Sequence, residues 1–336
     1  MPGRPASHAP AADSPLGAWW STRPPAAGSA VMATGIVSVG LHLTGYETLS
    51  RIMLVLAVLA WVGLAADFLA RLATQRDRWL EEARTPGALT AVAATSVLGT
   101  RVSALGRQTL AEALLALATA LWPVLLVLVM RHWKRRMPGA VFLVCVATQG
   151  LAVLGATLAA ALSTAWLAHA ALVLFWLGLV FYGLAFTRFD LGQVTRGAGD
   201  HWVAGGALAI SALAGSKLIS ADSASLYLWN RDDGDALRTV TVALLVLDLT
   251  WYAVLLAAEF ARPRPGYDVR RWATVFPMGM TAAATLSVAA ALEVSWLRTL
   301  GQVLLWIAVA VWLAVGAGAA LTARTGIAAL RSTGRR

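Results

Sequence analysis

Asp248 is the acidic residue whose position most strongly suggests chemistry. It lies near the middle of a long apolar stretch, in the segment Leu245-Val-Leu-Asp-Leu-Thr-Trp251. A charged side chain at the centre of a bilayer costs roughly 2.5–3.5 kcal/mol on insertion scales, so it needs a partner or a function. Two interpretations remain open. Asp248 is either a carboxylate that couples proton movement to transport or a structural hydrogen-bond acceptor between helices.

Arg101 and Lys217 are two cations near the ends of stretches rich in small residues. They occur in Gly99-Thr-Arg-Val-Ser103 and Gly215-Ser-Lys-Leu218. Cations at the mouth of a pathway raise the local concentration of anions. The alternative is that both side chains extend to the lipid headgroups. We expect them to attract anions.

The segment Trp272-Ala-Thr-Val-Phe-Pro-Met-Gly-Met280 combines a helix breaker with bulky apolar side chains. Pro277 removes a backbone donor and Gly279 permits close approach, so we expect a kink or break in this helix. A bulky apolar side chain in a pore lined by small residues acts as a hydrophobic gate. Phe276 and Met278 are the gate candidates, and the alternative is a core aromatic beside a packing kink.

The residue types needed for a metal or catalytic site do not cluster. Cys145 is the single cysteine, and His42 and His169 have no second ligand at helical spacing. Phosphate-binding, dinucleotide-binding and nucleophile-elbow motifs are absent from the sequence. We therefore expect no enzymatic activity, no cofactor and no metal. Asp67 with Arg71, and Glu259 with Arg262, have the spacing of ion pairs on one helix face.

The elements that must position these residues are apolar stretches of about 20 residues, long enough to span a hydrocarbon core of about 30 Å as helices. The chain is 59% hydrophobic and 13% charged, whereas soluble domains carry roughly 25% charge. The sequence predicts an all-α integral membrane protein. Its ten expected spans are 26–46, 50–73, 87–106, 108–131, 139–162, 164–187, 202–220, 236–261, 272–292 and 295–321.

Basic residues alternate between the gaps that separate these stretches. The termini and the gaps after the second, fourth, sixth and eighth stretches hold 20 of the 27 Lys and Arg residues. Short loops rich in Lys and Arg stay cytoplasmic, so both termini should be cytoplasmic in a cell (inner or plasma) membrane. This topology explains the net charge of +10 without a nucleic-acid partner. We expect a disordered tail at 1–24, a transmembrane domain at 25–323 and a basic tail at 324–336.

The short links group the stretches into five helical hairpins whose two helices differ in composition. The first helix of each pair is rich in small residues, and the second is rich in Leu and Trp. Small residues permit close packing or leave room for a lumen, so the alternatives are a solid bundle and a pore lined by the odd-numbered helices. The expected lining residues are Thr34, Gly35, Ser38, Thr95, Ser96, Gly99, Thr148, Gln149, Ser211 and Thr281.

Two motifs carry a resemblance to a known family. Ser29-Ala-Val-Met-Ala-Thr-Gly-Ile-Val-Ser38 and Phe276-Pro-Met-Gly-Met280 resemble the first-helix and ninth-helix motifs of the tellurite-resistance/C4-dicarboxylate transporter family. That family includes plant slow anion channels and fungal malate and sulfite transporters. The resemblance covers residues 20–320. It implies five quasi-fivefold hairpins around a central pore, a homotrimer, and a phenylalanine gate on the ninth helix. Alignment on Gly279 puts Met278 at the gate position, while Phe276 keeps the residue type.

We therefore expect a membrane transporter or channel for small anions of the C4-dicarboxylate, tellurite, sulfite or halide class. Its partners are small inorganic or carboxylate anions and the lipid bilayer. The first alternative is a proton-coupled carboxylate carrier that uses Asp248. The second is an integral membrane enzyme, which the scattered His, Cys, Asp and Glu residues disfavour.

Overall fold

A computed structural model describes residues 28–223, 226–263 and 266–333. In this part of the chain the structure is helical, with one isolated β-bridge between Met137 and Phe189 and no strand. The long helices are α2 (Gly28–Leu43), α3 (Glu47–Thr74), α5 (Thr90–Ala104), α6 (Gln108–Met130), α7 (Leu143–Leu162), α8 (Ala165–Arg188), α10 (Val203–Ala221), α11 (Arg231–Ala261), α12 (Trp272–Ala291) and α13 (Ser295–Thr333).

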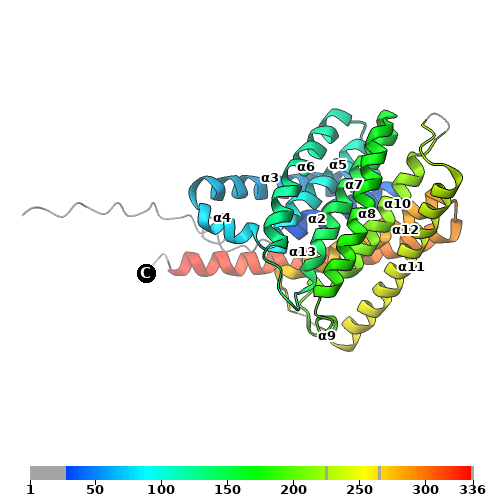
Figure 1. The fold of residues 1–336 in the computed structure, drawn as a ribbon. Helices are drawn as coiled ribbons and strands as arrows, with labels where there is room; N and C mark the ends of the chain where they lie inside the picture. Colours follow the sequence, from blue (N-terminus) through cyan, green and yellow to red (C-terminus); the bar gives the residue numbers. More distant parts are fainter. Residues whose placement is uncertain (1–27, 224–225, 264–265, 334–336) are drawn as a thin grey trace, which may run out of the picture.

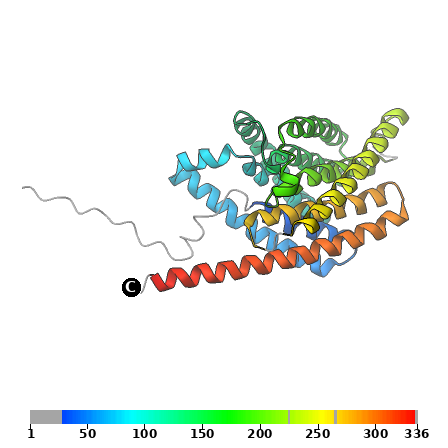
Figure 2. The same cartoon turned by 90° about the horizontal axis from the view of Figure 1, so that it is seen from below.

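Short helices connect several of the long ones. They are α4 (Arg76–Ala83), α9 (Gln193–Arg196), and the 3-10 turns η2 (Pro86–Leu89), η3 (Gly139–Phe142), η4 (Asp200–Trp202) and η5 (Val269–Arg271). α13 runs past the bundle on the side where α4 lies (Figures 1 and 2). It continues as one helix to Thr333, beyond the expected end of the tenth span. The expected tail at 1–24 lies outside the described residues.

Eight helices in the described residues are long and apolar enough to cross a membrane, which confirms eight of the expected spans. They are α3, α6, α7, α8, α10, α11, α12 and α13, three of them extended at the start by η3, η4 or η5. The two other expected spans contain α2, an apolar helix of 16 residues, and α5, which has 15. The chain is therefore a multi-pass membrane protein.

Burial separates the helices into an inner and an outer set, as their composition predicts. In the apolar windows of α7 and α12, 94% of residues are buried, against 11% for α3 and 17% for α6. Most residues of α2 and α5 are also buried. The inner set is α2, α5, α7, α10 and α12, and each packs against the next outer helix along the chain: α3, α6, α8, α11 or α13.

The inner helices contact one another in a closed cycle. α2 packs on α5, α5 on α7, α7 on α10, α10 on α12, and α12 returns to α2. Small residues make this closeness possible, because a side chain larger than hydrogen would collide at several crossings. A Cβ on Gly35 of α2 would lie 2.9 Å from Val97 Cγ1 of α5. The backbones of the inner helices therefore approach one another closely at these glycines.

Of the kink or break expected at Pro277, the break is wrong and the kink stays a prediction. α12 runs without interruption from Trp272 to Ala291. The proline ring packs against α10 where Gly206 leaves space, since a Cβ there would lie 2.9 Å from Pro277 Cγ. α12 continues as an α-helix through the proline, which transmembrane helices tolerate.

Candidate functional site

A narrow cavity lies among the inner helices, and each of the five contributes to its wall. It has about 10 Å³ of space, about as much as one water molecule requires. The lining residues are Ile36 and Val39 of α2, Ser96, Val97 and Thr100 of α5, Gly150 and Val153 of α7, Ile210 and Leu213 of α10, and Met280 of α12.

The wall of this central cavity is mainly aliphatic. Its hydroxyl groups belong to Ser96 and Thr100, and each donates to a carbonyl of its own helix at 2.9 Å. None of the described residues that line the cavity is charged. An anion at this level meets no opposite charge and little space, so the cavity has the properties of a closed hydrophobic constriction.

The predicted gate residues lie on α12 but do not line this cavity. Phe276 is fully buried in the main core cluster. Met278 packs in a second cluster with Val37, Leu41 and Trp202. Gly279 lies against α2, where a Cβ would be 2.8 Å from Ile36 Cγ2. Met280 is the α12 residue in the wall, and the sequence analysis missed it.

Three threonines of the expected pore lining bond to tryptophans of outer helices. Trp312 Nε1 donates to Thr34 Oγ1 at 3.0 Å, and Trp122 Nε1 donates to Thr148 Oγ1 at 3.0 Å. Trp61 Nε1 donates to Thr95 at 2.9 Å. In each case the tryptophan belongs to the outer helix that precedes the threonine's helix in the cycle. These hydroxyls therefore join neighbouring hairpins.

The other expected lining residues lie as follows. Ser96 lines the cavity. Ser211 donates to Ala207 O at 2.7 Å. Gln149 donates to Phe175 O of α8 at 3.0 Å. At Gly99, a Cβ would lie 2.6 Å from Leu154 Cδ2 of α7. Their part in a pathway stays a prediction.

The outer helices α3, α6 and α13 each use a tryptophan to bond to a threonine of the next inner helix. The outer helix α11 uses Asp248 in the same way. Asp248 is fully buried, and its Oδ1 accepts a hydrogen bond from Thr281 Oγ1 of α12 at 3.1 Å. Its Oδ2 has no hydrogen-bond partner among the described residues. The carboxyl group is thus a buried interhelical acceptor with one oxygen left over.

Arg101 is almost completely buried and holds together the ends of α2, α3 and α5. Its Nη2 donates to Glu47 Oε1 at 2.6 Å and its Nε to Ser50 Oγ at 2.9 Å. Glu47 also bonds to His42 at 2.8 Å and accepts from Arg51 at 3.1 Å. Ser50 Oγ in turn donates to Ser38 O of α2 at 2.7 Å. The Arg101 charge is therefore balanced by a carboxylate within the protein.

Lys217 differs from Arg101 because it has no carboxylate partner within the described residues and is only partly buried. The expected Asp67–Arg71 ion pair is confirmed at 2.9 Å. Glu259 accepts from Arg271 Nη1 at 2.7 Å. Before α12, the Arg270 guanidinium that bonds to Asp268 holds the pKa of this carboxyl group below its usual value. Within the described chain, no group of three or more His, Cys, Asp or Glu side chains could hold a metal.

The comparison with protein families decides the function class. The SLAC1 family model, described as voltage-dependent anion channel, matches residues 23–320. The chain belongs to this family. The match covers nearly the whole chain and confirms the family that the two helix motifs indicate. Membership gives the protein a role in anion transport through a membrane, in a family of channels and transporters. A comparison with curated proteins finds no match.

Proposed function

We propose that this protein moves small anions across the cell membrane along the axis of α2, α5, α7, α10 and α12. The observation that carries the proposal is the central cavity, whose wall takes residues from all five inner helices. In this proposal the shorter helices α2 and α5 also cross the membrane, which gives ten spans. The hairpins repeat with quasi-fivefold order, and both termini lie in the cytoplasm, as the basic loops favour.

The substrates are small inorganic or carboxylate anions of the C4-dicarboxylate, tellurite, sulfite or halide class. The uncharged wall of the cavity favours selection by diameter and by a diffuse positive potential over tight binding at a fixed cation. Lys217 supports this view because it is a cation without a carboxylate partner among the described residues. Family membership is the support for a homotrimer with one pathway in each subunit.

The aliphatic side chains of the central cavity form the gate in this proposal. Ile210, Leu213 and Met280 are large for a wall that also contains Gly150. Shortening one of them widens the constriction and lets a dehydrated or partly hydrated anion pass. Met280 therefore takes the role expected for Phe276 or Met278, because it is the α12 side chain that lines the cavity.

Anion flux into liposomes at a controlled membrane potential tests this function. We expect Met280→Ala to raise flux over a panel of chloride, nitrate, sulfite and malate. Met278→Ala is the matched control, since it shortens the same side chain on the same helix away from the cavity. Unchanged flux in Met280→Ala together with raised flux in Met278→Ala or Phe276→Ala would return the gate to the residues expected from the sequence. An absence of flux for every anion in all variants would contradict the transport proposal.

The second candidate function is a proton-coupled carboxylate carrier. The unpartnered Oδ2 of buried Asp248 favours it, because a buried carboxyl oxygen without a donor can take up a proton. Uptake driven by a pH gradient and lost in Asp248→Asn would support this function over the channel.

A further inference from the structure

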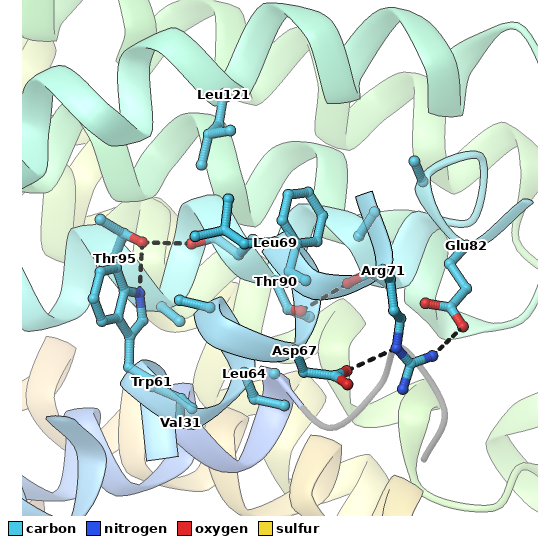
Figure 3. Close-up of a pocket in the computed structure, with 18 of the residues that line it drawn as sticks. Val31, Trp61, Leu64, Asp67, Leu69, Arg71, Glu82, Thr90, Thr95 and Leu121 are labelled. Carbon is cyan, nitrogen blue, oxygen red and sulfur yellow. Dashed lines mark hydrogen bonds and ion pairs between the residues drawn. The ribbon is translucent and has the colours of Figure 1, made fainter. Parts of the chain in front are cut away.

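A second and larger cavity lies on the outer side of the bundle, between α3 and α6 (Figure 3). Its volume is about 300 Å³, at the lower end of the range for ligand-binding cavities. α3 and α6 both pack on α5. The cavity lies between α3 and α6, against the surface of α5. It shares no lining residue with the central cavity.

The lining of this outer cavity is predominantly apolar. Small residues of α5 and η2 form its floor, and longer side chains of α3 and α6 form its sides. Leu69 of α3 and Leu117 of α6 are 62% and 40% exposed, so the cavity continues into the outward-facing apolar surface. Water is a poor occupant of such a space, because it needs two to four polar partners.

Polar groups occur at the two ends of the cavity. At one end, Arg71 bonds to Asp67 at 2.9 Å and to Glu82 at 2.6 Å, so these charges satisfy one another (Figure 3). At the other end, the Trp61 indole bonds to Thr95. Trp79 of α4 also lines the cavity, but its Nε1 is buried away from it. The site therefore suits a long apolar body.

We propose that the outer cavity binds one acyl chain of a glycerophospholipid from the surrounding leaflet. The chain lies against Leu64 and Leu121. Lipid is the occupant that the position favours, since the exposed apolar faces of α3 and α6 already lie in the hydrocarbon region of the membrane.

The site adjoins the helix that borders the central cavity. Thr95 and Ala94 of α5 line the lipid cavity, while Ser96 and Val97 of the same turn line the central one. A bound chain supports α5 from its outer side at the level of the constriction. Binding itself does not depend on the proposed transport, so the two proposals can fail separately.

The first experiment reconstitutes the full chain with phosphatidylglycerol that carries a diazirine on one acyl chain. We expect photo-crosslinks in residues 90–95, whose buried members an annular lipid does not reach, and in Leu64 or Leu121. Crosslinks confined to the exposed faces of α8 and α11 would overturn the proposal. So would crosslinking in residues 90–95 no higher than on those faces.

A pair of leucine variants on α6 gives the second experiment. Leu121→Trp fills the cavity, whereas Leu110→Trp adds the same bulk at a position that is 54% exposed and outside the lining. We expect Leu121→Trp to abolish the crosslinks in residues 90–95 and Leu110→Trp to keep them. Equal labelling in both variants would overturn the site. If Leu121→Trp does not fold, the crosslink positions in the unmodified chain still decide.

Discussion

The indole Nε1 of Trp312 donates to Thr34 Oγ1 at 3.0 Å, across 278 positions of sequence. This bond joins the last long helix, α13, to the first, α2. The same pairing joins α3 to α5 through Trp61 and Thr95, and α6 to α7. The tryptophan–threonine bonds therefore connect one hairpin to the next, including the last to the first.

Removal of the indole donor at the closing contact should weaken the cycle. We expect Trp312→Phe to lower the free energy of unfolding by about 0.6 kcal/mol, a typical value for an interhelical hydrogen bond in a membrane protein. A double-mutant cycle with Thr34→Val in detergent micelles measures the coupling. Trp306→Phe is the control, because Trp306 is 43% exposed on the same helix. Additive effects of Trp312→Phe and Thr34→Val would show that the bond contributes nothing.

A methyl group at Gly206 should separate α10 from α12. Its Cβ would lie 2.9 Å from Pro277 Cγ and 3.2 Å from Pro277 Cα, and neither the ring nor the backbone can move aside cheaply. We expect Gly206→Ala to destabilise the protein by about 1–3 kcal/mol, as overpacked cores do. Thermal unfolding measures this loss. Gly183→Ala is the matched control, since nothing lies within 4 Å of its added Cβ. Equal melting temperatures would contradict the close packing of α10 on α12.

Loss of the Glu47 carboxylate, which balances Arg101, should lower the free energy of unfolding more than loss of the nearby Arg51 cation. Glu47→Gln leaves a cation that is 1% exposed without its counter-charge. We expect a lower free energy of unfolding, because the buried guanidinium keeps no opposite charge. Arg51→Gln removes the other guanidinium that bonds to Glu47, but this side chain is 66% exposed and should change stability little. Equal losses in denaturant unfolding of the two variants would mean that Arg101 is solvated.

Substitutions of Asp248 separate a structural acceptor from a proton carrier. Asp248→Asn keeps an oxygen for the Thr281 hydroxyl, so we expect stability and anion flux close to those of the unmodified protein. Asp248→Leu removes the acceptor and should destabilise by about 1–3 kcal/mol, because the hydroxyl loses its partner. Flux is measured with and without a pH gradient. A gradient dependence that disappears in Asp248→Asn would instead favour the carrier.

Hydropathy and loop charge predicted most helix ends to within a few residues, because a span must be about 20 residues long and apolar whatever its neighbours are. The exceptions are the start of α11 and the end of α13, which continue beyond the expected spans. The composition of each helix also predicted which set is buried. α4 was not expected, since its eight residues, five of them charged, were read as part of a basic gap. The break at Pro277 was wrong because a proline inside a transmembrane helix is tolerated as well as disruptive, and the local sequence does not separate the two outcomes.

The site was less predictable than the fold, because it depends on the rotation of each inner helix about its axis. The side chains on every face of these helices are buried and mostly small. Hydropathy therefore does not indicate which face of α12 points into the cavity, and it does not separate Met280 from Met278. The ion-pair partner of a buried residue could not be predicted from the sequence either. Arg101 was expected to attract anions, but the sequence does not indicate that Glu47 on another hairpin lies 2.6 Å from its guanidinium.

The contact of α2 with α12 and α13 has a consequence for how the protein is made. α2 emerges from the ribosome before the other described helices, yet two of its packing partners are encoded about 240 to 280 residues later. Its sides that face α12 and α13 must therefore wait among lipids or insertion machinery while the intervening hairpins enter the membrane. The wall of the cavity becomes complete only when α12 packs on α2, so a chain truncated before α12 is an open arc.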